Sequence, residues 1–342
     1  MGMGTRTIAV TVAAILVAAA LVGGGIWYFT RAEGRDTTET ADTARAEDPD
    51  QTATISYQRL TGPDRTMARD GRGAVLAVFT DGARTVLVNG PNRTFREPKA
   101  TTAAINTQAW IRLAPEPWHQ GDERAIWFAP WFDQARADRT PDVLAIATDY
   151  LIDAPAEEDA KGVRFRGDAS FGPVKSSGVG RKEQSDFYDY LGVPWTFPGA
   201  PTTQPAPDRY GAVDCSGFIR LVYGYRMGIP LLGTNEPGPG LPRRAYAIAE
   251  SGPGVELVPN KRKRATAYGT LQPGDLVFFE IEDGPDQLDH AGIYLGLDDA
   301  GHHRFISSRE RIDGPTFGDV GGTSLLDDGG HYSTAWRAAR RL

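Results

Sequence analysis

The single cysteine of this 342-residue chain, Cys215, stands at a position suited to nucleophilic chemistry. Apolar residues follow it at helical spacing from Phe218 to Tyr225, and Asp214 is a good N-cap, so the sequence predicts a helix that begins at the cysteine. Backbone N–H groups and the positive helix end favour a thiolate there, which is the nucleophilic form of the side chain. The alternative is a small buried core residue, which is the commoner fate of a single cysteine.

A cysteine nucleophile needs a base within hydrogen-bond reach and a third group that orients the base. The chain has five histidines: His119, His290, His302, His303 and His331. His290 is the best candidate, because it begins a predicted strand whose next inward residues, Ile293 and Leu295, are apolar. A hydrogen-bonded structural histidine is the alternative for any such position.

The elements around these two residues indicate an α+β fold. The predicted cysteine helix is preceded by a short helix at 187–191 and followed by another that opens near 241–244. Strands are then predicted at 276–279, 289–296 and 304–308, separated by turn residues. A helix that carries a cysteine, followed by an antiparallel sheet, places the nucleophile against a rigid strand that carries the base.

Four ordered motifs resemble those of the NlpC-type cysteine peptidases of bacterial cell walls. They are Tyr-Leu-Gly-Val-Pro-Trp-Thr-Phe at 190–197, Asp-Cys-Ser-Gly-Phe at 214–218, Leu-Gln-Pro-Gly-Asp-Leu-Val-Phe-Phe at 271–279 and Asp-His-Ala-Gly-Ile-Tyr-Leu-Gly at 289–296. The resemblance covers residues 183–342 only. It implies a papain-like catalytic domain, in which the helix with the cysteine packs on an antiparallel sheet, and it implies no cofactor and no metal.

The resemblance also implies roles for individual residues. Cys215 takes the place of the nucleophile and His290 that of the general base. The third position falls on Ser307, and His303 is the alternative because it faces the same side of the strand two residues before Phe305. The residues expected to bind substrate are Trp195, Asp214, Ser216 and Arg243.

The expected reaction is hydrolysis of stem peptides in peptidoglycan, at the bond between D-γ-glutamate and a diamino acid. An imidazolium–thiolate pair of His290 and Cys215 would attack the carbonyl and form an acyl-enzyme. An amidase or acyltransferase on the same scaffold is an alternative function. A non-catalytic wall-binding or scaffolding protein is another, since a serine at the third position is short and uncharged.

Residues 1–31 contain an N-terminal membrane anchor or signal segment. No charge interrupts residues 8–29, and this length suffices for a helix that spans a bilayer, with Trp27, Tyr28 and Phe29 at one end as interfacial aromatics. A cleaved signal peptide is the alternative. We therefore expect a single-pass membrane protein with extracytoplasmic folded domains, or a secreted protein if the segment is removed.

The remaining sequence divides into three further parts. We expect residues 32–55 to form a disordered acidic linker and residues 56–160 to form a smaller α+β or β-rich N-terminal module of unknown role. Residues 161–182 are expected to be a connector. The formal net charge of −7 argues against nucleic acid as a partner, and one cysteine excludes an intramolecular disulfide or a multi-cysteine zinc site. A regulatory protein partner is not identifiable from the sequence.

Overall fold

The computed structural model describes residues 54–282 and 287–342. The predicted anchor at 8–29, within the 1–31 segment, and the linker up to residue 53 lie outside this range, so their assignment stays a prediction. Within the described ranges, no helix has the length and apolar character needed to cross a membrane.

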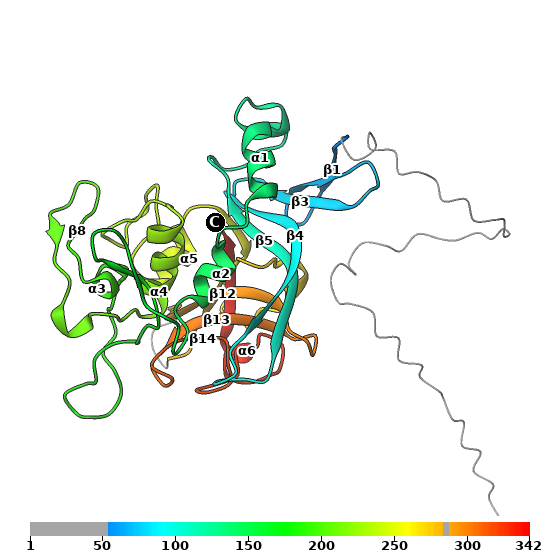
Figure 1. Ribbon diagram of the computed structural model, residues 1–342. Coiled ribbons are helices and arrows are strands. Elements are labelled where there is room, and N and C mark those ends of the chain that lie inside the picture. Colours follow the sequence, from blue (N-terminus) through cyan, green and yellow to red (C-terminus); the bar gives the residue numbers. More distant parts are fainter. Residues whose placement is uncertain (1–53, 283–286) are drawn as a thin grey trace, which may run out of the picture. The chain divides into compact units, whose positions relative to one another are not determined.

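The N-terminal strands form one antiparallel sheet with neighbours in chain order (Figure 1). Its strands are β1 (Ser56–Leu60), β2 (Arg65–Arg69), β3 (Val75–Thr80), β4 (Thr85–Arg96) and β5 (Ala104–Leu113). Strands β3 and β4 are joined by a turn in which Gly82 has a φ of 81°. An aromatic cluster joins Phe79 and Trp118 to Phe128 and Phe132 of helix α1 (Phe128–Ala137).

The second sheet carries six strands in the order β10-β15-β11-β12-β13-β14, all paired antiparallel. They are β10 (Val255–Val258), β11 (Leu276–Phe279), β12 (His290–Leu297), β13 (His303–Arg309), β14 (Gly314–Thr316) and β15 (Trp336–Arg341). The three strands predicted from the sequence form its centre, β11 to β13. The last strand, β15, inserts between β10 and β11, and its Arg341 forms a buried ion pair with Asp275.

Short helices pack around this sheet, and the helix at 331–335 lies on the face opposite the one that the cysteine helix covers. They are α2 (Val143–Thr148), α3 (Phe187–Leu191), α4 (Cys215–Ile219), α5 (Ala245–Ser251) and α6 (His331–Ala335), with single 3-10 turns at η2 (Asp122–Arg124), η3 (Pro207–Arg209) and η5 (Tyr268–Thr270). The helix predicted from Cys215 onward has α geometry only to Ile219 and continues as the π-helical segment η4 (Arg220–Arg226). Two small hairpins, β6 (Glu157–Glu158) with β7 (Arg164–Arg166) and β8 (Trp195–Thr196) with β9 (Thr202–Thr203), complete the described elements.

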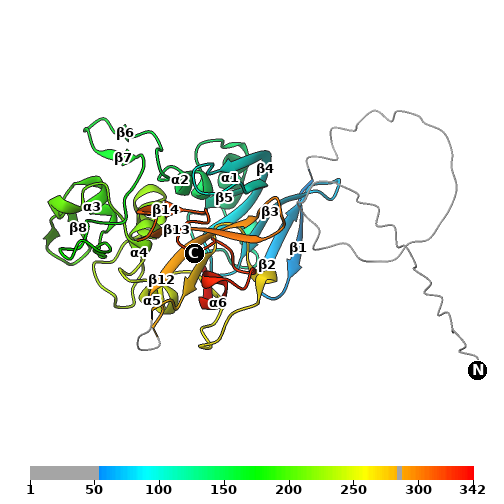
Figure 2. The same cartoon turned by 90° about the horizontal axis from the view of Figure 1, so that it is seen from below.

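One hydrophobic cluster joins β5 of the first sheet to the second sheet, and Figure 2 shows the two sheets beside each other. Ile105 and Ile111 of β5 belong to the same buried cluster as Phe218 of α4 and Ile293 of β12. The carboxylate of Glu97 accepts hydrogen bonds from the Thr316 hydroxyl and the Phe317 N–H, both at 2.8 Å. Residues before and after the predicted connector therefore stabilise each other, while the boundaries at 56–160, 161–182 and 183–342 stay a prediction.

Candidate active site

Cys215 is the first residue of α4, and the residues around it explain the Asp-Cys-Ser-Gly sequence. The Asp214 carboxylate accepts a 2.7 Å hydrogen bond from the Gly217 N–H and so caps the helix. A Cβ at residue 217 would lie 2.3 Å from the Ser185 carbonyl oxygen, so only glycine fits this close approach of two backbones. The helix start, and with it the sulfur, is held in place by both contacts.

A buried network of charges lies under the start of α4. Arg243 donates to both carboxylate oxygens of Asp214, at 2.7 and 3.2 Å, and to the Ser216 hydroxyl at 2.8 Å. Its Nε lies 3.4 Å from Asp186, whose carboxylate also accepts from the fully buried Arg220 at 2.9 Å. Three of the four residues expected to bind substrate thus also bind one another and orient the cysteine.

The cysteine sulfur lies against the backbone that carries His290. Its Sγ is 3.8 Å from the Asp289 carbonyl oxygen, and it accepts a hydrogen bond from the Ala291 N–H. These are the two residues on either side of the histidine. Helix α4 packs on β12 and β13, so the element that carries the nucleophile rests on the two strands that carry its predicted partners.

Ser307 is the predicted third residue that lies beside the histidine. Its Oγ is 3.0 Å from His290 Nε2, and it is fully buried on the neighbouring strand β13. His303 is not brought to this place: its Nδ1 lies 2.7 Å from the Tyr294 hydroxyl and its ring stacks on Tyr268. Four residues along a strand amount to about 13 Å, which is why the two candidates on one face are separated.

Arg309 is a residue of the site that the sequence analysis missed. Its Nε donates to Ser307 Oγ at 3.0 Å, and its guanidinium lies 4.2 Å from the centre of the Tyr332 ring. The only sequence signal was its spacing of two from Ser307, which places both side chains on one face of β13. Without the structure, that spacing does not distinguish a buried arginine from a solvated one.

Cys215 and His290 line one pocket of about 580 Å³. Asp214 and Ser216 contribute to its wall. Further wall residues bring charges of both signs, namely Glu183, Glu282, Glu310, Arg244, Arg309 and Arg311. Trp195 is not part of the wall, because it packs between Phe187 at 4.9 Å and Tyr225 at 6.1 Å, measured between ring centres.

The environment of the two reactive side chains favours their neutral forms. Burial raises the pKa of the Cys215 thiol, and the negative charge of Asp214 raises this pKa further. The hydrogen bond from the Ala291 N–H acts in the opposite direction and lowers it. Burial also lowers the pKa of His290, to about 3. The positive charges of Arg309 and His331 lower this pKa further, whereas the negative charge of Asp214 raises it. Both shifts favour a thiol and a neutral imidazole in the free site, and the imidazolium–thiolate pair expected from the sequence stays a prediction.

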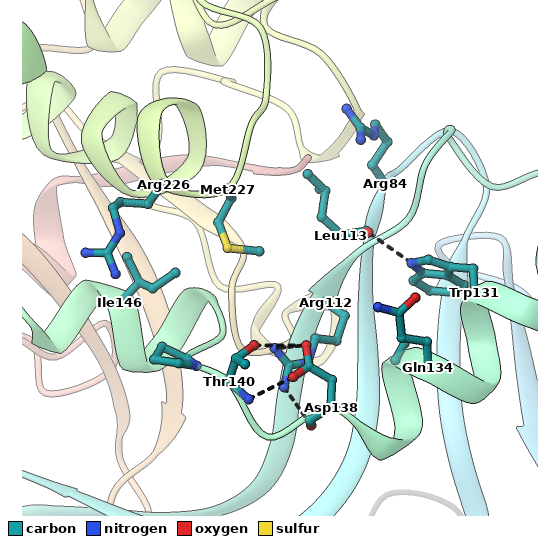
Figure 3. A pocket seen from close by; sticks show the side chains of 12 residues that line it. Arg84, Arg112, Leu113, Trp131, Gln134, Asp138, Thr140, Ile146, Arg226 and Met227 are labelled. Atoms are coloured by element: carbon teal, nitrogen blue, oxygen red, sulfur yellow. Dashed lines mark hydrogen bonds and ion pairs between the residues drawn. The ribbon is translucent and has the colours of Figure 1, made fainter. Parts of the chain in front are cut away.

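A second pocket, of about 480 Å³, lies between β5, α1 and the end of η4. Three arginines line it, but their guanidinium groups do not converge (Figure 3). Arg112 is bound to Asp138 at 3.1 Å, Arg226 is hydrogen-bonded to the Tyr150 hydroxyl, and Arg84 donates to the Ala114 carbonyl. The three arginines of this pocket thus each have a separate partner among the described residues.

The chain was compared with family models, curated proteins and solved structures. Residues 192–318 match the model of the NlpC/P60 family. No curated protein matches the chain. Among solved structures, the chain is similar to an NlpC/P60 family protein from Bacillus cereus ATCC 10987, with 14% sequence identity and a TM-score of 0.26, over 84% of this chain and 78% of that chain.

Proposed function

We propose, on the premise that residues 192–318 match the NlpC/P60 family, that the protein is a cysteine peptidase that cleaves stem peptides of bacterial peptidoglycan. Family membership supports a cell-wall hydrolase in general terms. The observation that carries the finer proposal is that Cys215 and His290 line one pocket, while the buried Ser307 is hydrogen-bonded to His290 Nε2.

The chemistry follows from the neutral state of the pair. His290 accepts the thiol proton while the Cys215 sulfur attacks the carbonyl carbon, so charge develops during attack and not before it. The backbone N–H of Cys215, at the start of α4, is placed to stabilise the oxyanion. His290 then gives the proton to the leaving amine, and water hydrolyses the acyl-enzyme through the same base.

The pocket wall supports a substrate that carries charges of both signs. Glu183 and Glu282 provide negative charge and Arg244 and Arg311 positive charge around the nucleophile. Stem peptides carry free carboxylates and an amine on the diamino acid, so such a wall can position them by complementary charge. We place the cleaved bond between D-γ-glutamate and the diamino acid.

We further propose that the protein acts at the cell membrane as a single-pass protein with extracytoplasmic folded parts. The uncharged segment 8–29 supports this placement, and secretion after cleavage of the same segment is the alternative. Both placements bring the catalytic domain to its substrate, peptidoglycan.

The decisive experiment digests purified peptidoglycan with the full-length protein and identifies soluble fragments by mass spectrometry. The wild type should release fragments that end at D-γ-glutamate, and Cys215→Ala should release none. His119→Ala, at an exposed histidine far from the pocket wall, is the matched control and should cleave as the wild type does. Undiminished cleavage by Cys215→Ala would overturn the proposal.

Two other functions give different results in this assay. An amidase or acyltransferase on the same scaffold would yield products with a different terminus. A non-catalytic wall-binding protein would bind sacculi without releasing fragments, and the neutral thiol and imidazole of the free site are the observation that favours it.

A further inference from the structure

The hydrogen bonds of Ser307 determine which nitrogen of His290 carries the proton. Ser307 is fully buried, and two groups lie within hydrogen-bond distance of its hydroxyl, namely His290 Nε2 and Arg309 Nε, both at 3.0 Å. An arginine side chain has five N–H donors and no acceptor, so the contact with Arg309 uses a lone pair of Ser307 Oγ. The hydroxyl hydrogen is therefore left for His290.

This assignment gives an acceptor to each hydrogen that lies between Arg309 and His290. Arg309 Nε–H donates to Ser307 Oγ, and Ser307 Oγ–H donates to His290 Nε2, which must then be without hydrogen. A neutral imidazole with a bare Nε2 carries its proton on Nδ1. The reverse assignment, with Nε2–H donating to the same oxygen, leaves the hydroxyl hydrogen buried without an acceptor among the described residues.

Arg309 is itself fixed by contacts on its other nitrogens. Its Nη1 donates to the Gly322 carbonyl at 2.6 Å and its Nη2 to the Ser324 hydroxyl at 2.5 Å, while its guanidinium lies over the Tyr332 ring. No carboxylate within the described residues forms an ion pair with it. Its positive charge therefore acts on the neighbouring imidazole without a direct counter-charge.

We propose that Arg309 is a positioning residue that, through Ser307, holds His290 in the tautomer with hydrogen on Nδ1 and keeps Cys215 unactivated in the free protein. Because Nε2 is used by Ser307, Nδ1 is the nitrogen left for the thiol, and a protonated Nδ1 cannot accept its hydrogen. Activation then requires that Ser307 turns its hydrogen away and accepts from Nε2–H. This inference rests on the proposed function only in assigning His290 as the base.

The other groups that face His290 do not reverse this effect. Arg309 on β13 and His331 on α6 both disfavour a positive imidazole, and Asp214 at the helix start favours one. The rings of Phe279 on β11 and Tyr332 on α6 lie 5.8 and 5.5 Å from the imidazole and bring no full charge. Burial acts in the same direction as Arg309 and keeps the ring neutral.

The tautomer can be measured directly by nitrogen NMR of the full-length protein, labelled with ¹⁵N at histidine and held in a mild detergent. His290→Gln assigns the signals of residue 290 among the five histidines. In the wild type at neutral pH, His290 should give the pattern of a neutral ring protonated on Nδ1. Arg309→Met should convert it to the Nε2-protonated form, because Ser307 is then free to accept.

Two further variants keep the test valid if Arg309→Met does not fold. Ser307→Ala removes the donor to Nε2 and should also abolish the Nδ1-protonated pattern. Ser324→Ala, the matched control, removes one contact of Arg309 but leaves the Arg309–Ser307–His290 chain intact, so the wild-type pattern should persist. A wild-type His290 that is protonated on Nε2, or doubly protonated at neutral pH, would overturn the inference.

Alkylation of Cys215 by iodoacetamide gives an independent measure, again without any wall substrate. We expect slow alkylation of the wild type at pH 7 and roughly tenfold faster alkylation of Arg309→Met, since one unit in pKa changes the thiolate fraction tenfold. Equal rates would contradict the proposal. If the wild type cleaves peptidoglycan but His290 is protonated on Nε2, only this inference fails. If the wild type does not cleave peptidoglycan but His290 is protonated on Nδ1, only the proposed function fails.

Discussion

Replacement of Asp214 by asparagine should destabilise the protein and at the same time make its cysteine more reactive. Asp214 is almost completely buried and has two roles, as N-cap of α4 and as partner of Arg243. Although burial alone raises the pKa of Asp214, Arg243 and the Gly217 N–H hold it below its usual value. Its negative charge in turn raises the pKa of the Cys215 thiol.

The magnitude follows from which contacts an asparagine can keep. Its carbonyl oxygen can still accept from the Gly217 N–H, but its amide group would point two hydrogens at the Gln184 N–H and Arg243 Nη2, which now donate to Oδ2 at 2.9 and 2.7 Å. Removing one partner of a buried ion pair costs about 3–5 kcal/mol. Loss of the charge should raise the thiolate fraction at pH 7 roughly tenfold, the effect of one unit in pKa.

Chemical denaturation measures the first effect and iodoacetamide kinetics the second. Asp189→Asn is the matched control, because Asp189 is buried and accepts two backbone N–H bonds at 2.8 Å, and within the described residues it forms no ion pair with an arginine. We expect a smaller loss there, about 1–3 kcal/mol, and unchanged alkylation. If Asp214→Asn costs no more than Asp189→Asn, or leaves alkylation unchanged, the account of the site's electrostatics is wrong.

The sign of the pH dependence provides a further check on the same variant. A carboxylate whose folded-state pKa is lowered stabilises the protein fully above its unfolded value, here 3.8, and loses that contribution as pH falls through the folded value. The difference in unfolding free energy between wild type and Asp214→Asn should thus be constant near neutrality. It should shrink below pH 3.8.

Two other predictions concern stability. The pKa of His290 is 6.5 in the unfolded chain and about 3 in the folded protein, so the wild type loses stability as the pH falls below 6.5. In urea titrations, the difference in unfolding free energy between wild type and His290→Gln should therefore decrease by about 2 kcal/mol from pH 7 to pH 5. A constant difference would contradict this. Glu97→Ala leaves the Thr316 hydroxyl and Phe317 N–H without their acceptor and should cost about 1–3 kcal/mol, with faster hydrogen exchange at Phe317. The exposed Glu116→Ala should stay within about 0.5 kcal/mol, and an equal loss there would remove the assigned role of Glu97.

The sequence was most informative where local pattern and site coincide. The N-cap and helix start at Cys215, and strands β11 to β13, follow from capping residues and apolar runs that need no knowledge of distant partners. Strand β15 was not predicted as a strand, because a run with two buried arginines reads as solvent-exposed until Asp275 is placed beside it. The same difficulty hid Arg309, whose partners Gly322 and Ser324 lie 13 and 15 residues further along the chain.

Other differences arise because one residue type serves two purposes. Asp214, Ser216 and Arg243 were expected to bind substrate, and the structure shows that they also bind each other. Trp195 matched a motif position near the active site, yet its indole is used for packing against Phe187. The sequence could not decide whether Ser307 or His303 contacts His290, because alternation along a strand places both side chains on one face but does not fix their distance from the histidine. In the structure the two residues lie at different places along β13, and only Ser307 reaches His290.

The common core of the two sheets has a consequence for how the chain acquires its structure. Strand β5 contacts β12, so side chains such as Ile111 find partners that follow about 180 residues later in the sequence, at Ile293. Contacts of such long sequence separation slow folding, because a large loop must close before they form. The first strands to be synthesised therefore expose apolar surface until the later strands are made. We expect the yield of folded protein to depend more on chaperones than on the secondary-structure propensity of any single element.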